Sequence, residues 1–362
     1  MSRFNPLGGL FSRSSPAPSL ADRLAFVQAR RPRYRSPNTG PAWIDPAWRA
    51  RHVLESVDPQ PKLAGVTTWI YQLQKIDPAL IAASEADVAV IDFTPDGDGT
   101  PQFARAEVDA MRRKLGGRKK IISYMSIGEA EEWRFYWKRD WMVERGGKKR
   151  KSRSCPAWVY DENAAWSSFR VRYWDPEWQK IILGEGDSYL NRIIAAGFDG
   201  VYLDIVNGYQ EFADKGRKTA ATEMIQFVIA IAKAARKQNP DFLIVPQNGE
   251  QLLTEPTYRA YISAIGKEDI LYNNVGQAND EHTFVTRNPS NESWEVEGFL
   301  QHGKRDGIPV LAVEYLHSVK PENLAAIPAT ADELRRLGYV PYFGNRLLNK
   351  VYDPVLPPAP VA

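Results

Sequence analysis

Cysteine is almost absent from this chain of 362 residues, because Cys155 is its only one. A lone cysteine excludes an intrachain disulfide, so we expect a fold that does not depend on an oxidising compartment. Long apolar runs are missing too. No segment approaches the length of a membrane span, and residues 1–35 contain no signal-peptide core. The sequence alone therefore predicts a cytoplasmic protein, or a secreted one whose leader is missing.

The chain also lacks a large excess of charge of either sign, since its formal net charge is only +3. Nucleic-acid-binding proteins usually show a far stronger basic bias, so we expect no nucleic-acid partner, and we expect no membrane partner. With 43% hydrophobic and 25% charged residues, the chain has the composition of a globular protein. It can bury a sizeable core, and we expect a monomer.

The spacings typical of metal and nucleotide sites are absent as well. The four histidines form no HExxH motif, and Gly184-Glu185-Gly186 lacks the third glycine of a dinucleotide-binding turn. Asp96-Gly97-Asp98-Gly99-Thr100 lacks the terminal glutamate of a calcium loop. We therefore expect no metal and no organic cofactor.

Alternating strand-like and helix-like segments begin near Thr67 and continue to about residue 350. Residues 1–60 are rich in Pro, Arg and Ser and predict a loose arm, and residues 351–362 form a Pro-rich tail. Eight strands are expected, at Thr67–Leu73, Val88–Thr94, Lys120–Ile127, Gly200–Ile205, Phe242–Gln247, Ile270–Asn274, Pro309–Tyr315 and Tyr339–Phe343.

Helix-like runs separate these strands. They include Gln102–Leu115, Glu177–Ala195, Thr219–Lys237, Pro256–Ile265 and Ala331–Leu337, and the third of them has apolar residues at clear helical spacing. Eight strand-then-helix units favour a (β/α)8 TIM barrel over residues 61–350. An open doubly wound sheet would place a glycine-rich phosphate turn after the first strand, and none follows Leu73.

One long insert interrupts the alternation after the third strand. It runs from Glu131 to Asp175 and contains six tryptophans, among them Trp133, Trp137 and Trp174. So many aromatic residues predict an ordered cap over the mouth of the barrel, with tryptophans available as sugar-stacking surfaces.

Acidic residues lie at or just past the ends of five of the predicted strands: Asp92, Glu129, Asp204, Glu250 and Glu314. Parallel strands of a barrel end at one mouth, where barrel enzymes carry their chemistry, so we expect these carboxyls to share a cleft. Asp204 directly follows the apolar run Val201-Tyr202-Leu203, and Glu250 lies just beyond the turn Asn248-Gly249. Two facing carboxyls suit glycosidic bond cleavage, and we predict Asp204 as nucleophile and Glu250 as acid/base, with net retention.

Neutral polar residues at the same strand ends could hydrogen-bond sugar hydroxyls. The predicted substrate-binding residues, acids included, are Trp69, Gln72, Asp92, Tyr124, Ser126, Glu129, Trp174, Gln247, Asn248, Asn274 and Glu314.

Taken together, these segments resemble the glycoside hydrolase family 114 barrels, the endo-α-1,4-polygalactosaminidase group. The resembling stretches are Trp69–Leu73, Ile91–Phe93, Ser123–Glu131, Tyr173–Trp178, Gly197–Asp204 and Pro246–Glu250. The resemblance implies a TIM barrel that hydrolyses α-1,4-linked galactosamine polymers without a metal or organic cofactor. It places the catalytic pair at Asp204 and Glu250.

Two other interpretations stay open. The chain could be a non-catalytic carbohydrate-binding barrel with a retained cleft. The run Lys148-Lys149-Arg150-Lys151-Ser152-Arg153, which departs from the family pattern, could also contact an anionic polymer.

Overall fold

The computed structural model describes residues 60–97, 101–114, 117–275, 284–318 and 320–356. The predicted N-terminal arm lies outside these residues apart from Gln60. No helix within the described ranges is both long and apolar enough to cross a membrane.

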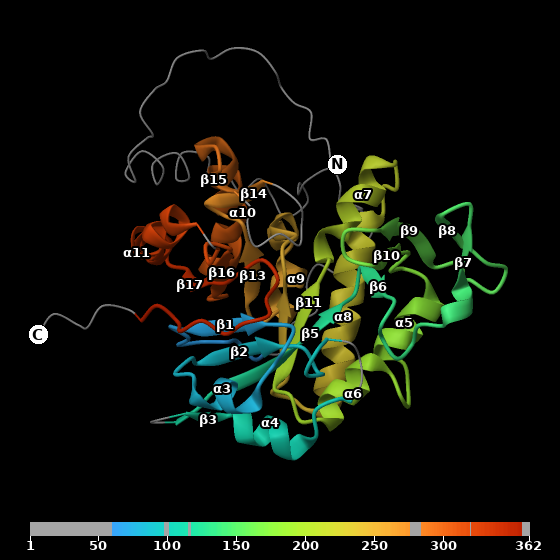
Figure 1. The fold of residues 1–362 in the computed structure, drawn as a ribbon, viewed down its shortest axis with the longest axis horizontal. Helices are drawn as coiled ribbons and strands as arrows, with labels where there is room; N and C mark the ends of the chain where they lie inside the picture. Colours follow the sequence, from blue (N-terminus) through green and yellow to red (C-terminus); the bar gives the residue numbers. More distant parts are fainter. Residues whose placement is uncertain (1–59, 98–100, 115–116, 276–283, 319, 357–362) are drawn as a thin grey trace, which may run out of the picture.

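Two parallel sheets form the centre of the protein (Figure 1). The five-stranded sheet has the order β1-β2-β5-β11-β12, and the three-stranded sheet has the order β13-β16-β17. Their bounds are β1 Trp69–Gln72, β2 Val88–Ile91, β5 Lys120–Ser126, β11 Gly200–Asp204, β12 Leu243–Pro246, β13 Ile265–Glu268, β16 Val310–Glu314 and β17 Val340–Phe343. The fold is therefore of the α/β class, as the alternation of segments predicted.

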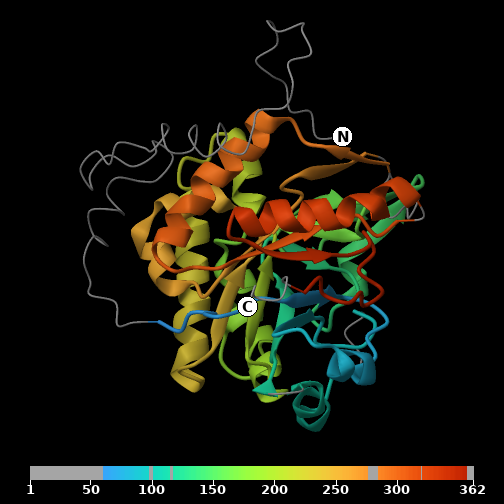
Figure 2. The same cartoon turned by 90° about the vertical axis from the view of Figure 1, so that its left-hand side faces the viewer.

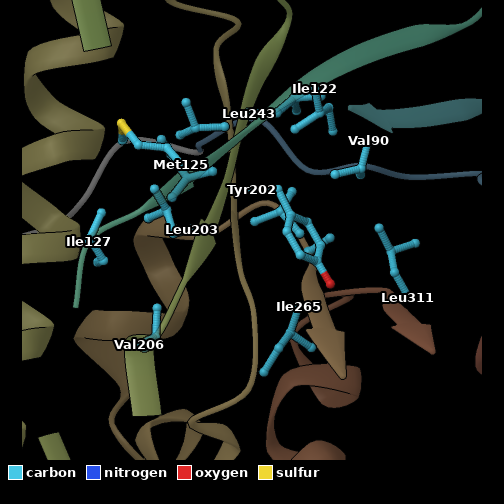
Figure 3. Close-up of a cluster of buried hydrophobic side chains, with 14 of the residues drawn as sticks. Val90, Ile122, Met125, Ile127, Tyr202, Leu203, Val206, Leu243, Ile265 and Leu311 are labelled. Atoms are coloured by element: carbon cyan, nitrogen blue, oxygen red, sulfur yellow. The ribbon is translucent and has the colours of Figure 1, made fainter. Parts of the chain in front are cut away.

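The strands are short apolar runs because both of their faces are covered. Every residue of β2 (sequence VAVI) and of β16 (VLAVE) is buried. Figure 3 shows how side chains from several strands, among them Ile122, Tyr202 and Leu311, meet in one core. Tyr202 comes so close to β13 that a Cβ at Gly266 would lie 2.0 Å from the tyrosine oxygen, which is why β13 has a glycine there.

The helices lie outside the strands. They are α3 Pro78–Ala83, α4 Arg105–Met111, α5 Pro176–Leu183, α6 Tyr189–Ala195, α7 Tyr209–Asp214, α8 Ala220–Gln238, α9 Pro256–Tyr261, α10 Ser290–Arg305 and α11 Pro321–Arg336, with short 3₁₀ turns η2 Val206–Gly208 and η3 Glu250–Thr254. Figure 2 shows α10 and α11 on the outer side of the second sheet. The expected helix Glu177–Ala195 is two helices, because α5 ends where Gly184 takes an extended conformation.

One of the eight predicted strands was misplaced. The strand expected at Ile270–Asn274 is present as β14 (Tyr272–Val275), but it is not one of the parallel strands, because it pairs antiparallel with β15 (Phe284–Arg287) outside both parallel sheets. The sixth parallel strand is β13, which begins four residues after α9 ends at Tyr261. The helix expected at Pro256–Ile265 is α9, which ends earlier, and Ile265 is the first residue of β13.

The insert after β5 forms a small antiparallel structure of its own. Strands β6 (Glu129–Glu131), β10 (Ser168–Val171) and β9 (Val159–Asn163) make one sheet. The turn η1 (Arg139–Trp141) leads into a hairpin of β7 (Met142–Arg145) and β8 (Lys148–Lys151). A second short hairpin, β3 (Arg113–Lys114) and β4 (Gly117–Arg118), precedes β5.

Candidate active site

One cavity of about 470 Å³ lies at the carboxyl ends of the eight parallel strands, and each strand or the segment that follows it contributes lining residues. The residues that line it are Tyr71, Leu73, Gln74, Asp92, Asp96, Gly97, Tyr124, Ser126, Glu129, Glu131, Trp133, Arg134, Trp166, Ser168, Asp204, Ile205, Asn207, Gln247, Asn248, Glu268, Tyr315, Arg346, Leu347 and Leu348. The cavity therefore lies where parallel α/β proteins bind ligands.

Asp204, the last residue of β11, is fixed by two hydrogen bonds. Tyr124 Oη donates to its Oδ2 at 2.8 Å, and the backbone N–H of Ile205 donates to its Oδ1 at 2.7 Å. Burial, followed by repulsion from Glu268, nevertheless raises the pKa of Asp204 to about 7. Asp204 therefore holds a proton up to about neutral pH.

Glu268, the last residue of β13, has the opposite tendency. Burial disfavours its charge, but the guanidinium of Arg346 at 3.8 Å and hydrogen bonds from Tyr315 and Asn248 outweigh burial and lower its pKa. Asn248 holds this residue at two points, since its Nδ2 donates to the carboxylate at 3.0 Å and its Oδ1 accepts from the Glu268 N–H at 3.2 Å.

Left-handed backbone follows three neighbouring strands at this mouth. Ile205 (φ 56°) follows Asp204, Asn248 (φ 58°) follows Gln247, and Asp269 (φ 53°) follows Glu268. This conformation is a true outlier for a β-branched isoleucine. Gly128 permits it, because a Cβ there would lie 2.3 Å from the Ile205 carbonyl oxygen. Such strain concentrates at functional sites.

A buried cation neutralises two of the acids in the cavity wall. Arg134 binds both oxygens of Asp92, at 2.9 and 2.6 Å, and also pairs with Glu131. The Arg134 side chain is only 1% exposed, so the three residues form a closed ionic cluster. Asp92 is thereby occupied in holding the insert to β2.

Glu129 is a further buried carboxylate in the cavity wall, and it is not part of this cluster. It accepts from Ser168 Oγ at 2.6 Å and from Asn163 Nδ2 at 3.1 Å, and both donors are neutral. No ion pair to it occurs among the residues that the structure describes. Glu129 therefore gives the cavity negative charge.

The aromatic residues of the insert divide into two groups. Trp133, which is 38% exposed, and Trp166 line the cavity. Trp166 lies 5.5 Å from Arg346, whose guanidinium also covers the ring of Tyr315 at 4.7 Å. Trp137 instead packs against Trp141 and Phe169 inside the insert. Only part of the insert therefore reaches the mouth.

The structure thus gathers seven of the residues that the sequence predicted for the site. Asp92, Tyr124, Ser126, Glu129, Asp204, Gln247 and Asn248 all line the cavity. Six others do not, namely Trp69, Gln72, Trp174, Glu250, Glu314 and Asn274, although the side chain of Asn274 lies outside the described part of the chain.

Each of the other five has a contact elsewhere. The Trp69 indole is buried and donates to the carbonyl of Val340, and Gln72 donates to the carbonyls of Gln74 and Lys75. Trp174 packs on Phe212 beneath Arg217. These three side chains are used in packing and turn formation.

The two acids have comparable explanations. Glu314 accepts from the N–H groups of Leu271 and Tyr272 at the start of β14, and burial raises its pKa to about 8. Glu250 is the first residue of η3, hydrogen-bonded by Gln251 and 4.0 Å from Lys267. The cavity offers Glu268 in the place expected for Glu250.

Several residues of the cavity were not predicted. Glu268 was missed because the strand before it was misplaced, and a strand ending at residue 268 would have shown it as a strand-end acid. Tyr315 and Arg346 lie shortly after β16 and β17. A tyrosine or an arginine at such a position indicates a functional site less clearly than an acid does. Among the described residues, no cluster of His, Cys, Asp and Glu could hold a metal ion.

We expect Trp133→Ala to weaken polymer binding by about threefold to tenfold, because an exposed indole at the cavity would stack on sugar. The mutant should keep its melting temperature. Trp158→Ala is the matched control, since Trp158 is 1% exposed and packs on Trp141 and Trp178. It should lose about 3–5 kcal/mol of unfolding free energy. Equal KM values for Trp133→Ala and the parent would remove Trp133 from the binding surface.

One family model covers most of the chain. The family model described as glycoside-hydrolase family GH114 matches residues 51–355. An uncharacterized protein of Methanocaldococcus jannaschii is 36% identical over 283 residues, covering 76% of this chain and 74% of the relative. Another, of Deinococcus radiodurans, is 34% identical over 298 residues, covering 81% and 84%. The glycoside hydrolase domain of PelA from Pseudomonas aeruginosa has a similar fold, with a TM-score of 0.59 at 19% identity, covering 81% of this chain and 99% of that one.

Proposed function

The chain belongs to glycoside-hydrolase family GH114, and from this we propose that it hydrolyses an α-1,4-linked galactosamine polysaccharide with the carboxyls of Asp204 and Glu268. One observation carries the proposal. Two acids from β11 and β13 line one cavity, and their pKa values are shifted in opposite directions. Such a pair can supply one protonated and one ionised carboxyl at the same pH.

We further infer that the two parallel sheets close into one (β/α)8 barrel. The support is the cavity, which is lined from the carboxyl end of every one of the eight strands, by the strand or by the segment that follows it. At one junction Gln247 and Gly266 form a parallel bridge, and at the other the Trp69 indole donates to Val340 at 3.0 Å. This arrangement would place Asp204 and Glu268 at the ends of the fourth and sixth barrel strands.

The charge of the cavity supports a polymer with free amines. Arg134 neutralises Asp92 and Glu131, and Arg346 faces Glu268. Glu129 then remains as a buried carboxylate surrounded by neutral donors. A sugar ammonium would donate hydrogen bonds to Glu129 and neutralise its charge, whereas an N-acetyl group would not neutralise it.

Within the pair we assign Asp204 as nucleophile and Glu268 as acid/base, with net retention. Tyr124 and the Ile205 N–H hold the short carboxyl of Asp204 in one orientation, which suits in-line attack. The pKa shifts place the resting proton on Asp204, so we infer that the reactive form is the one in which this proton has moved to Glu268. Its arrival there removes the repulsion that raises the pKa of Asp204. An NMR spectrum showing the β-anomer as the first product would overturn this assignment.

Incubation with α-1,4-linked polygalactosamine, free or N-acetylated, tests the function through the masses of the products. We expect shorter fragments from the free-amine polymer and none with Asp204→Asn. Binding without any fragments would favour the non-catalytic carbohydrate-binding barrel instead.

The reaction should slow as the pH rises above about 7. The pKa of Asp204 is raised to about 7, so the shared proton is bound below that pH and lost above it. The lowered pKa of Glu268 keeps the pair from taking up a second proton until the pH is clearly acidic. The pH profile of kcat should therefore fall about tenfold per unit on the alkaline side. A profile that stays flat to pH 9 would contradict the shared proton.

A further inference from the structure

The hairpin of β7 and β8 projects from the edge of the molecule (Figure 1). Gly146 and Gly147 form its two-residue turn, with φ of 62° and 68°, the left-handed backbone that such tight turns need. All four residues of β8, which has the sequence KKRK, are exposed. The hairpin therefore carries charge that does not contribute to the core.

The register of the hairpin sorts its side chains onto two faces. Directly paired residues of antiparallel strands share a face, and successive residues alternate. The pairs Val143–Arg150 and Arg145–Lys148 thus lie on one face, which we call the cationic face. It carries three cations and no acid.

The opposite face is fastened to the rest of the insert. Lys149 pairs with Glu132 and also lies 3.9 Å from Glu162, and Lys151 donates to the carbonyls of Val159 and Tyr160. These contacts hold the hairpin in place and leave the cationic face turned away from them. Within the described residues, neither an ion pair nor a side-chain hydrogen bond engages Arg145, Lys148 or Arg150.

Folding does not account for this arrangement. Arg145 and Lys148 are direct cross-strand neighbours, and like charges placed opposite each other destabilise a hairpin. An exposed hairpin that needs only solubility would be better served by mixed charges. The repulsion is relieved when an anionic ligand lies across the face.

We propose that the cationic face binds an anionic polysaccharide that carries carboxylates, at a site separate from the catalytic cavity. A narrow ribbon with three cations suits a linear chain of carboxylates, and two of the cations are arginines, which bind carboxylate in a bidentate manner. The hairpin also belongs to the same insert as Trp133 and Trp166, which line the proposed glycan cavity.

Other polyanions fit the structure less well. The whole chain has a net charge of only +3, which is far below that of nucleic-acid-binding proteins. The face has a single apolar residue, Val143, whereas surfaces that insert into membranes need a large apolar side. The negatively charged cavity would repel an anionic polymer, so we assign this partner to attachment and not to hydrolysis.

The test measures binding of the full chain to polygalacturonate, with neutral dextran and double-stranded DNA as comparison ligands. The variant Arg145→Gln/Lys148→Gln/Arg150→Gln should bind polygalacturonate at least about tenfold more weakly than the parent protein. Arg113→Gln/Lys218→Gln/Lys237→Gln is the matched control, because it removes the same charge from exposed positions elsewhere. The control should bind as the parent does, and both variants should keep their melting temperatures.

Three results would overturn the proposal. They are no binding of polygalacturonate by the parent, an equal loss in the control, and binding of DNA as tight as that of polygalacturonate. Because the assay needs no turnover, it can be repeated with Asp204→Asn, and its outcome is independent of the proposed hydrolysis.

Discussion

Replacing Glu268 with glutamine should lower kcat by about 10²–10⁴-fold, whereas Glu250→Gln should retain activity close to that of the parent. Glu268 lines the cavity beside Asp204 and raises its pKa, while Glu250 lies outside the lining in η3. The change is nearly isosteric. The amide oxygen can still accept from Asn248, and the Tyr315 hydroxyl can rotate to accept from the amide nitrogen. The loss of kcat in Glu268→Gln would therefore reflect the missing carboxyl and not a change in the fold.

Steady-state kinetics on one polymer preparation, with melting temperatures for each variant, makes the comparison. The alkaline limb of the pH profile gives a second readout. Without the charge of Glu268, the pKa of Asp204 should fall from about 7, because repulsion from Glu268 is the second cause of its rise after burial. Should Glu250→Gln lose activity while Glu268→Gln keeps it, the pair would be Asp204 and Glu250, as the sequence alone predicted.

The second large effect concerns stability. Arg134→Met should cost about 3–5 kcal/mol of unfolding free energy, because it leaves Asp92 and Glu131 buried without their cation. Lys215→Met is the control. Lys215 pairs with Glu211 at 2.7 Å, but its side chain is 47% exposed, so its loss should cost under about 1 kcal/mol.

Urea unfolding of both variants near pH 7 measures the difference. The Arg134 variant should recover part of its stability as the pH falls, since protonation removes the uncompensated charges of Asp92 and Glu131. Equal losses of unfolding free energy for Arg134→Met and Lys215→Met would mean that water reaches the cluster of Arg134, Asp92 and Glu131.

Seven of the eight parallel strands could be predicted because their sequences are mostly apolar, with few polar interruptions. The exception, Ile265–Glu268, has the sequence IGKE and follows a short helix almost at once. Gly266 makes room for Tyr202, and Glu268 faces the cavity. These two of the strand's four residues therefore lack the apolar side chain that would indicate a strand. Tertiary contacts, not local preference, decide that these residues are extended.

The site was predictable to the same extent. Acids and amides at the ends of apolar runs, such as Asp204, Glu129 and Asn248, could be found from position alone. Arg134 could not, because its role depends on Asp92, which lies 42 residues earlier in the chain and meets it only in the fold. Trp69 and Gln72 were overpredicted, since a polar or aromatic residue on a strand has the same pattern whether it faces a cavity or the core.

The junction between the two sheets has a consequence for motion. Asp204 ends a strand of the larger sheet and Glu268 ends a strand of the smaller one. Their neighbouring edges β12 and β13 share one bridge, Gln247–Gly266, and a few hydrogen bonds beside it, such as that from the Asn248 N–H to the Gly266 carbonyl at 2.8 Å, in place of a full ladder. Edges that share few hydrogen bonds separate more readily than laddered ones. Opening of this seam would change the gap between the two carboxyls, so amide exchange along β12 and β13 would report on the width of that gap.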